Sequence, residues 1–271
     1  MLRYILLLLC VFLAVSCHQN KEYAKTKAVG VPEITHKDPK NPIDTELIDW
    51  KPYGKNIDTQ SSTYKEYSSY FPKIENSALK NRIIVVSMED SLKPWEEKFK
   101  LALFCTGKFV VVERDLEKYA SVLQQIAQNP EEALKTLSNS LHSQYLLILK
   151  KEKNQSKWIL YSLLEKKQLH EESIPEENVL PIIANISHDV SKADWKGQIA
   201  SEPLPDNKVI INAGALDGVK KGDTFKVESP LKEEGEEEIL VIEEVEDKYA
   251  TSRIKGMKSL SKGTNIKEVK S

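Results

Sequence analysis

The fold of this chain is decided by a short stretch, RIIVV at residues 82–86. It is continuously apolar and rich in β-branched residues, which is typical of a strand buried on both faces of a sheet. The roughly sixty residues before it are polar and interrupted by prolines, so a globular domain is expected to begin here. Pro94 can open a helix after this strand, and Gly107 stands where the helix would end.

The alternation of apolar strands and amphipathic helices continues for about a hundred residues. We expect strands at 109–112 and 145–149, a hairpin over 157–173, and helices over 115–126, from Pro130 and over 179–190. The order β-α-β-α-α-β-β-β-α predicts an α/β domain over residues 81–196. This domain would be a mixed sheet with packed helices.

Residues 197–271 have a different texture. Five short strands separated by turns are predicted at 208–212, 224–228, 238–245, 251–254 and 264–268. This pattern predicts a small all-β, barrel-like C-terminal domain. Gly218 and Gly222 lie in two of its turns, where a positive φ is expected, and we interpret both glycines as structural.

The N-terminus has the order of an export signal. Arg3 precedes an apolar run over residues 5–15, which is too short to span a bilayer. The sequence LAVS at 13–16 leads directly into Cys17 and resembles the bacterial lipobox. We therefore predict a lipoprotein signal peptide over 1–16 and lipidation, such as palmitate, on Cys17. The alternative is a plain signal peptide with an incidental cysteine.

Residues 17–80 are predicted to be a lipidated, largely disordered tether, because apolar residues are sparse and show no period. Aromatic residues between Trp50 and Phe71 interrupt this pattern. They either pack against the following domain, which we favour, or dock on a partner.

No residue pattern predicts catalysis. The five histidines are not spaced as paired metal ligands, and neither a metal nor another cofactor is expected. The net charge of -2 gives no reason to expect nucleic acid as a partner. Cys105 is expected to be a buried, inert thiol. The glutamate-rich run at 233–238 is expected to be a solvated hairpin tip rather than a calcium loop.

The segment FVVVERDL at 109–116, continued by VLQQ at 122–125, resembles the strand-to-helix signature of the curli-secretion-channel lipoprotein superfamily. That superfamily also resembles the N-terminal domain of TolB and the lipoprotein activators of penicillin-binding proteins. The resemblance covers residues 81–193. Residues 208–225 are similar to the C-terminal domain of flagellar assembly protein T. No strands are available for the transmembrane hairpins of the curli channel, so we do not expect a pore.

Both resemblances imply an envelope assembly protein without catalytic residues. The leading hypothesis is a non-enzymatic lipoprotein that acts as an assembly or adaptor factor for another envelope protein or machine. His18 follows Cys17 in place of the aspartate associated with inner-membrane retention, which favours the periplasmic face of the outer membrane. The cell surface stays an alternative location. The rival functions are an outer-membrane activator of a peptidoglycan synthase, and a ligand-binding protein or hydrolase with an unrecognised pocket.

Overall fold

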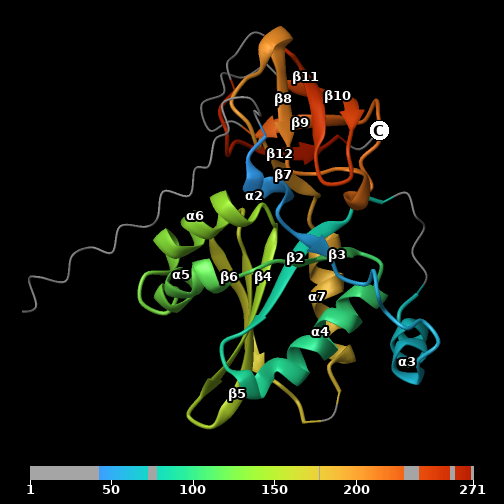
Figure 1. Cartoon of the computed structure of the whole chain (residues 1–271), viewed down its shortest axis with the longest axis vertical. Helices are drawn as coiled ribbons and strands as arrows, with labels where there is room; N and C mark the ends of the chain where they lie inside the picture. The colour runs from blue at the N-terminus through green and yellow to red at the C-terminus, as the bar shows by residue number, and fades with distance from the viewer. Residues whose placement is uncertain (1–42, 73–77, 177, 229–237, 257–259, 270–271) are drawn as a thin grey trace, which may run out of the picture. The chain divides into compact units, whose positions relative to one another are not determined.

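Two β-sheets organise the described part of the chain (Figure 1). The computed structural model describes residues 43–72, 78–176, 178–228, 238–256 and 260–269. All of them belong to one compact unit, Lys37–Ser271. The predicted signal peptide, Cys17 and most of the glutamate-rich run lie outside the described residues.

The first sheet has the strand order β1-β3-β2-β4-β5-β6. Its strands are β1 (Lys51–Pro52), β2 (Asn81–Ser87), β3 (Phe109–Glu113), β4 (Tyr145–Glu152), β5 (Gln155–Ser162) and β6 (Lys167–Ser173). β2 pairs in parallel with β3 and β4, and the other neighbours pair antiparallel. Lys153 and Asn154 both have a positive φ between β4 and β5, which suits a two-residue hairpin turn.

Helices cover both faces of this sheet (Figure 1). They are α4 (Lys93–Cys105), α5 (Ala120–Gln125), α6 (Pro130–Leu141) and α7 (Leu180–Lys192). α4 and α7 lie on one face and α5 and α6 on the other. Val85 and Leu147 share a core cluster with Phe99 of α4 and Ile183 of α7, because alternate residues of a strand face the same side. Within the described residues, no helix combines the length and apolarity needed to cross a bilayer.

The second sheet is a curled half-barrel of antiparallel strands in the order β7-β12-β9-β10-β11-β8. The strands are β7 (Lys196–Gln198), β8 (Lys208–Ile211), β9 (Thr224–Glu228), β10 (Ile239–Val245), β11 (Ala250–Lys255) and β12 (Asn265–Glu268). A bridge between Ile199 and Ile211 links the chain beyond β7 to β8. Phe225 and Leu240 are buried inside the curl.

The predicted fold class is confirmed in its coarse form: the chain has mixed α/β content and two sheets, and the second sheet is curled. The expected strand and helix order appears along the first sheet. The sequence analysis missed β7, which pairs with β12. Three residues are too few to show a period of two, and the expected boundary after residue 196 falls inside this strand.

The predicted tether is wrong over residues 43–72. This segment forms α2 (Thr45–Ile48), β1 and α3 (Ser62–Tyr70), and it packs on the rest of the compact unit. Leu47 is 0 % and Trp50 is 4 % exposed, and Tyr67 is buried as well. Trp50, Tyr67 and Phe71 therefore pack on the body, as the favoured alternative expected, whereas Tyr70 is exposed. The positions of these aromatic residues fit the surface that buries them, so their sequence shows no helical or strand period.

Gly218 and Gly222 both have left-handed backbone conformations, with φ values of +90° and +93°. A Cβ at Gly218 would lie 3.0 Å from the carbonyl oxygen of Ala78, whereas a Cβ at Gly222 would meet nothing within 4 Å. Gly218 follows a 3-10 helix, Ala215–Asp217, that approaches the first sheet. Both turns thus require a positive φ, but only the turn at Gly218 also leaves little space for a side chain.

Candidate functional site

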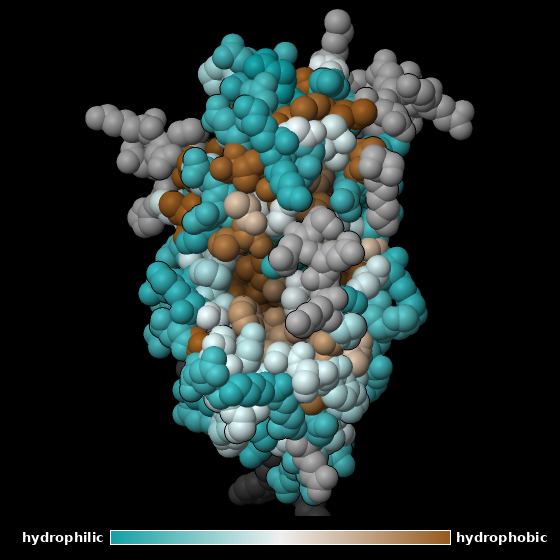
Figure 2. Space-filling model, turned by 90° about the vertical axis from the view of Figure 1, so that its right-hand side faces the viewer, coloured by the Kyte–Doolittle hydropathy of each residue, from teal (hydrophilic) through white to brown (hydrophobic). Residues whose placement is uncertain are grey.

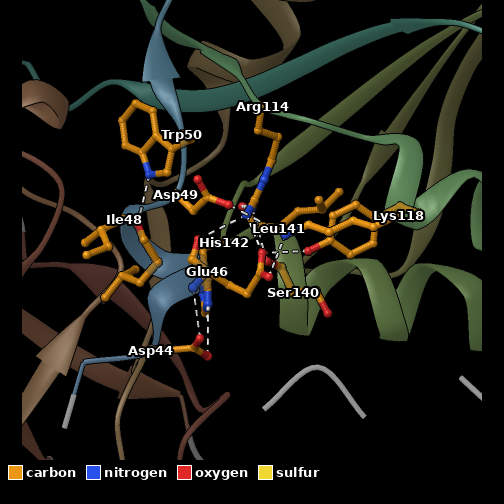
Figure 3. A network of polar contacts seen from close by, with 12 residues as sticks. Asp44, Glu46, Ile48, Asp49, Trp50, Arg114, Lys118, Ser140, Leu141 and His142 are labelled. Atoms are coloured by element: carbon orange, nitrogen blue, oxygen red, sulfur yellow. Dashed lines mark hydrogen bonds and ion pairs between the residues drawn. The ribbon is translucent and has the colours of Figure 1, made fainter. Parts of the chain in front are cut away.

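A buried polar network joins residues 44–50, which we call the strap, to both sheets (Figure 3). Glu46 lies at its centre. The Glu46 carboxylate accepts hydrogen bonds from Tyr119 Oη at 2.7 Å and from Lys118 Nζ at 2.6 Å, and it pairs with Arg114. Burial by itself raises the pKa of Glu46, but the hydrogen bonds from Lys118 and Tyr119 and the charge of Arg114 lower it overall. Glu46 is therefore ionised at neutral pH.

Arg114, the arginine of the FVVVERDL segment, is a structural residue in this network. Its Nη1 donates to the carbonyl oxygens of Ser140 at 3.2 Å and Leu141 at 3.1 Å, in the last turn of α6. Its Nη2 donates to the backbone oxygen of Glu46 at 3.2 Å. A cation at the carbonyl end of a helix is favourable, and this one also holds the strap.

Arg82, the first residue of RIIVV, links the two sheets. Arg82 Nε and Nη2 donate to the two carboxylate oxygens of Asp217 at 2.8 and 2.6 Å, and both side chains are at most 1 % exposed. The Arg82 guanidinium also lies 4.7 Å from the centre of the Trp50 ring. Lys248 Nζ donates to the carbonyl oxygens of Ile48 and Trp50. The strap is thus held by residues of both sheets or their loops.

The beginning of the strap rests on a buried histidine. His142 ends α6 with a positive φ of 49°, and its Nε2 lies 3.7 Å from Asp44 Oδ2. Asp44 also pairs with Lys262. Burial lowers the pKa of His142 and outweighs the opposite effect of Asp44. Burial tends to raise the pKa of Asp44, but the nearby His142 side chain and the ion pair with Lys262 lower it overall.

A first surface pocket, which we call the apolar groove, has a volume of about 880 Å³. It lies between α3, the end of α4, the end of α7 and the start of the second sheet. Figure 2 shows an apolar hollow in the middle of this side of the molecule. Its apolar lining consists of Phe71, Pro72, Ala78, Leu79, Phe104, Phe109, Val190, Ala193 and Trp195.

Cys105 also lines the apolar groove. It is partly exposed rather than buried, which differs from the expectation. Burial of the sulfur raises the pKa of the Cys105 thiol to about 11. The thiolate is the reactive form of cysteine, so this thiol reacts slowly at neutral pH.

A second pocket of about 870 Å³, which we call the charged crevice, lies outside the carboxyl ends of β2 and β3. Open α/β sheets commonly bind ligands at such a position. Ser87 Oγ donates to Glu96 Oε2 at 2.6 Å, and Lys100 Nζ lies 2.7 Å from Glu96 Oε1. Burial tends to raise the pKa of Glu96 and to lower that of Lys100, but their mutual contact reverses both shifts. Both groups are held in their charged forms.

These charges do not suit Ser87 for nucleophilic catalysis. A serine nucleophile needs a neighbouring base whose pKa lies near the working pH. The pKa of Lys100 is raised, so it stays protonated, and the pKa of Glu96 is lowered, so it is a weak base. Within the described residues, no group of three or more histidine, cysteine, aspartate or glutamate side chains is arranged to hold a metal ion.

The sequence analysis did not identify Arg82, Asp217 or Glu46 as site residues. A charged residue at the start of an apolar strand was the one available signal for Arg82. Its partner is 135 residues away, and pairing at such separation leaves no local pattern. Gly218 lies against Ala78 at the edge of the apolar groove, and no described side chain lies within 4 Å of a Cβ placed at Gly222.

Comparison with models of known protein families and with curated proteins gave no match to this chain. The resemblance to the curli-secretion-channel superfamily therefore stays a prediction that rests on the segments quoted above.

Proposed function

We propose that this protein is a non-enzymatic lipoprotein, anchored through Cys17 on the periplasmic face of the outer membrane. It acts there as an adaptor or assembly factor that binds another envelope protein. The lipobox-like sequence at 13–17 supports the anchor. The resemblance of residues 81–193 to envelope lipoproteins supports the class of partner.

The apolar groove is the observation that carries the adaptor function. A hollow of about 880 Å³ that is lined mainly by apolar side chains has the size and character of a binding site. The charged crevice is the usual place for chemistry in this type of sheet, but its ionisable groups neutralise one another. This contrast favours binding over the hydrolase alternative.

The strap supports the same function by joining the anchored end of the chain to both sheets. Cys17 and Ile43 are 26 positions apart (43 − 17), a length that spans at most about 90 Å when fully extended. This limit is less than half of the roughly 200 Å allowed by a tether that reaches residue 80. The shorter reach weakens the case for an activator that must extend far from its membrane.

Photo-crosslinking in intact cells tests the proposal. A benzophenone amino acid is placed at Tyr64 or at Ser68, both of which line the apolar groove. We expect both positions to give one discrete adduct with the same partner protein. The same amino acid at Lys93, on the charged crevice, serves as the matched control and is expected to give none.

A second part of the experiment tests whether the lipid anchor is needed for crosslinking. With Cys17→Ser in the background, the adduct from Tyr64 should fall strongly, because the protein is no longer held beside its partner. Two results would overturn the adaptor function: no adduct at either groove position, or adducts of equal yield at Tyr64, Ser68 and Lys93.

A further inference from the structure

We propose that the apolar groove binds a segment of a partner polypeptide in which apolar side chains are flanked by carboxylates. This inference rests on the proposed adaptor function and names the chemistry of its partner. It follows from the hydrogen bonding, the charge and the surroundings of the groove.

Four neutral polar side chains of the groove donate hydrogen bonds to backbone oxygens of the protein itself. Trp195 Nε1 donates to the Lys80 carbonyl oxygen at 2.9 Å, and Thr106 Oγ1 donates to the Leu103 carbonyl oxygen at 2.6 Å. The hydroxyls of Ser68 and Ser191 likewise donate to backbone oxygens one helical turn earlier. A neutral sugar needs unpaired donors and acceptors for recognition, and these four groups are already paired. Apolar side chains need none, and they gain from leaving water.

The charge of the groove favours an acidic partner. Among the described residues of its lining, the charged side chains are those of Lys80, Lys108 and Glu268, so two cations stand against one anion. Lys108 Nζ makes one long hydrogen bond, 3.4 Å to the Ser187 carbonyl oxygen, and an ammonium group has three donors. Lys80 Nζ has no hydrogen bond or ion pair to any described residue. Both ammonium groups can therefore meet carboxylates of the bound segment.

The surroundings of the groove favour a polypeptide over a free acyl chain. Tyr70 is 48 % exposed and is one of the three large exposed apolar residues in the described chain. It precedes the lining residue Phe71, and its ring packs edge-on against that of Phe71 with centroids 5.2 Å apart. An exposed aromatic side chain beside an apolar hollow is typical of a protein interface.

The rate of Cys105 alkylation measures binding in the apolar groove, because Cys105 lines it. A chain that begins at His18 lacks the lipidated residue, keeps the whole compact unit Lys37–Ser271 and contains Cys105 as its single cysteine. Alkylation of Cys105 by N-ethylmaleimide at mildly alkaline pH is followed by mass spectrometry. The probes are two peptides with one leucine- and phenylalanine-rich centre, flanked by aspartates in the first and by lysines in the second, and laurate as a free acyl chain.

The aspartate-flanked peptide should slow Cys105 alkylation at a concentration about tenfold lower than the lysine-flanked peptide, as expected for two weak charge pairs. The double variant Lys80→Glu/Lys108→Glu should reverse this preference. The double variant Lys51→Glu/Lys93→Glu changes the same charge on the charged crevice and should leave the preference unchanged.

Equal protection by both peptides, or protection by laurate alone, would overturn the inference. The outcome is separable from the proposed function. If the groove positions crosslink in cells while neither peptide protects Cys105, the adaptor function stands and the partner chemistry is wrong. If the aspartate-flanked peptide protects Cys105 while no adduct forms in cells, the adaptor function fails instead.

Discussion

At the scale of single residues, the ion pair of Arg82 and Asp217 is unusual because both side chains are buried. Both charges are withdrawn from water, and desolvation of an ion costs several kcal/mol unless the partner and further hydrogen bonds compensate. The compensation is present. Asp217 Oδ2 also accepts from the Gly214 backbone N–H at 2.7 Å, and Arg82 Nη2 donates to the Lys248 carbonyl oxygen.

Removal of one partner should therefore be costly. We expect Asp217→Asn to lower the free energy of unfolding by about 3–5 kcal/mol, because it leaves the Arg82 charge buried and unpaired. Urea unfolding measures this change. Asp90→Asn breaks the exposed Lys93–Asp90 pair and should leave the free energy of unfolding nearly unchanged. Equal losses in the two variants would show that the Arg82–Asp217 pair does not hold the sheets together.

The two turn glycines allow a matched comparison. Gly218→Ala and Gly222→Ala each place a side chain at positive φ, which costs about 1–3 kcal/mol. Only the alanine at residue 218 also meets the Ala78 carbonyl oxygen, at 3.0 Å. We expect the larger loss of stability for Gly218→Ala in thermal unfolding. A larger loss for Gly222→Ala would contradict the assigned contact.

At the scale of elements, the strap depends on the body that surrounds it. α2 has four residues, and so short a helix is not stable in water by itself. Its order comes from buried Leu47 and from the ion pairs of Asp44 and Glu46. The strap is therefore the element whose attachment responds most directly to protonation.

The strap should loosen in acid, in two steps. His142 has a folded pKa below its usual 6.5, so the stability that its neutral form contributes is lost as the pH falls below about 6.5. Asp44 and Glu46 have folded pKa values below their usual 3.8 and 4.5, so their contribution is lost below about pH 4.5. Limited proteolysis across residues 43–61 measures the release. His142→Asn should remove the first step, and persistence of both steps in that variant would exclude His142.

Truncation separates the strap from the residues before it. A chain that begins at Ile43 should melt like the chain that begins at His18, whereas a chain that begins at Tyr53 should lose several kcal/mol. The second truncation removes buried Leu47 and Trp50, each of which contributes about 1.5–3 kcal/mol, and leaves Arg114 without Glu46. Equal melting temperatures for the three chains would show that residues 43–52 do not stabilise the body and belong to the tether after all.

The sequence predicts those elements whose own pattern is strong. The strands at 82–86 and 109–112 are long enough to show continuous burial, and Pro130 indicates the start of α6 by its fixed φ. β1, α2 and β7 have two to four residues each, so no period can form in them. Their order is imposed by partners distant in the chain, such as Arg114 for Glu46, and these pairings define the network.

At the scale of the whole molecule, membrane attachment is expected to depend on one atom. Cys17→Ser should move the protein from the membrane fraction to the soluble fraction, because lipid on that sulfur is the proposed anchor. Cell fractionation with immunodetection measures the change, and Cys105→Ser is the control that should leave the distribution unaltered. Persistence of the Cys17→Ser variant in membranes would refute the lipid anchor.

The position of the strap has a mechanical consequence. With lipid on Cys17, tension between the membrane and a partner held in the apolar groove would act on the strap, which precedes both sheets in the chain. Its ion pairs to Lys262, Arg114 and Lys118 would resist that tension together. If these ion pairs break, residues 44–50 add about 20 Å to the extended chain between the lipid and the folded body, while both sheets stay folded. The strap would then be the first element to unfold under tension between the membrane and the bound partner.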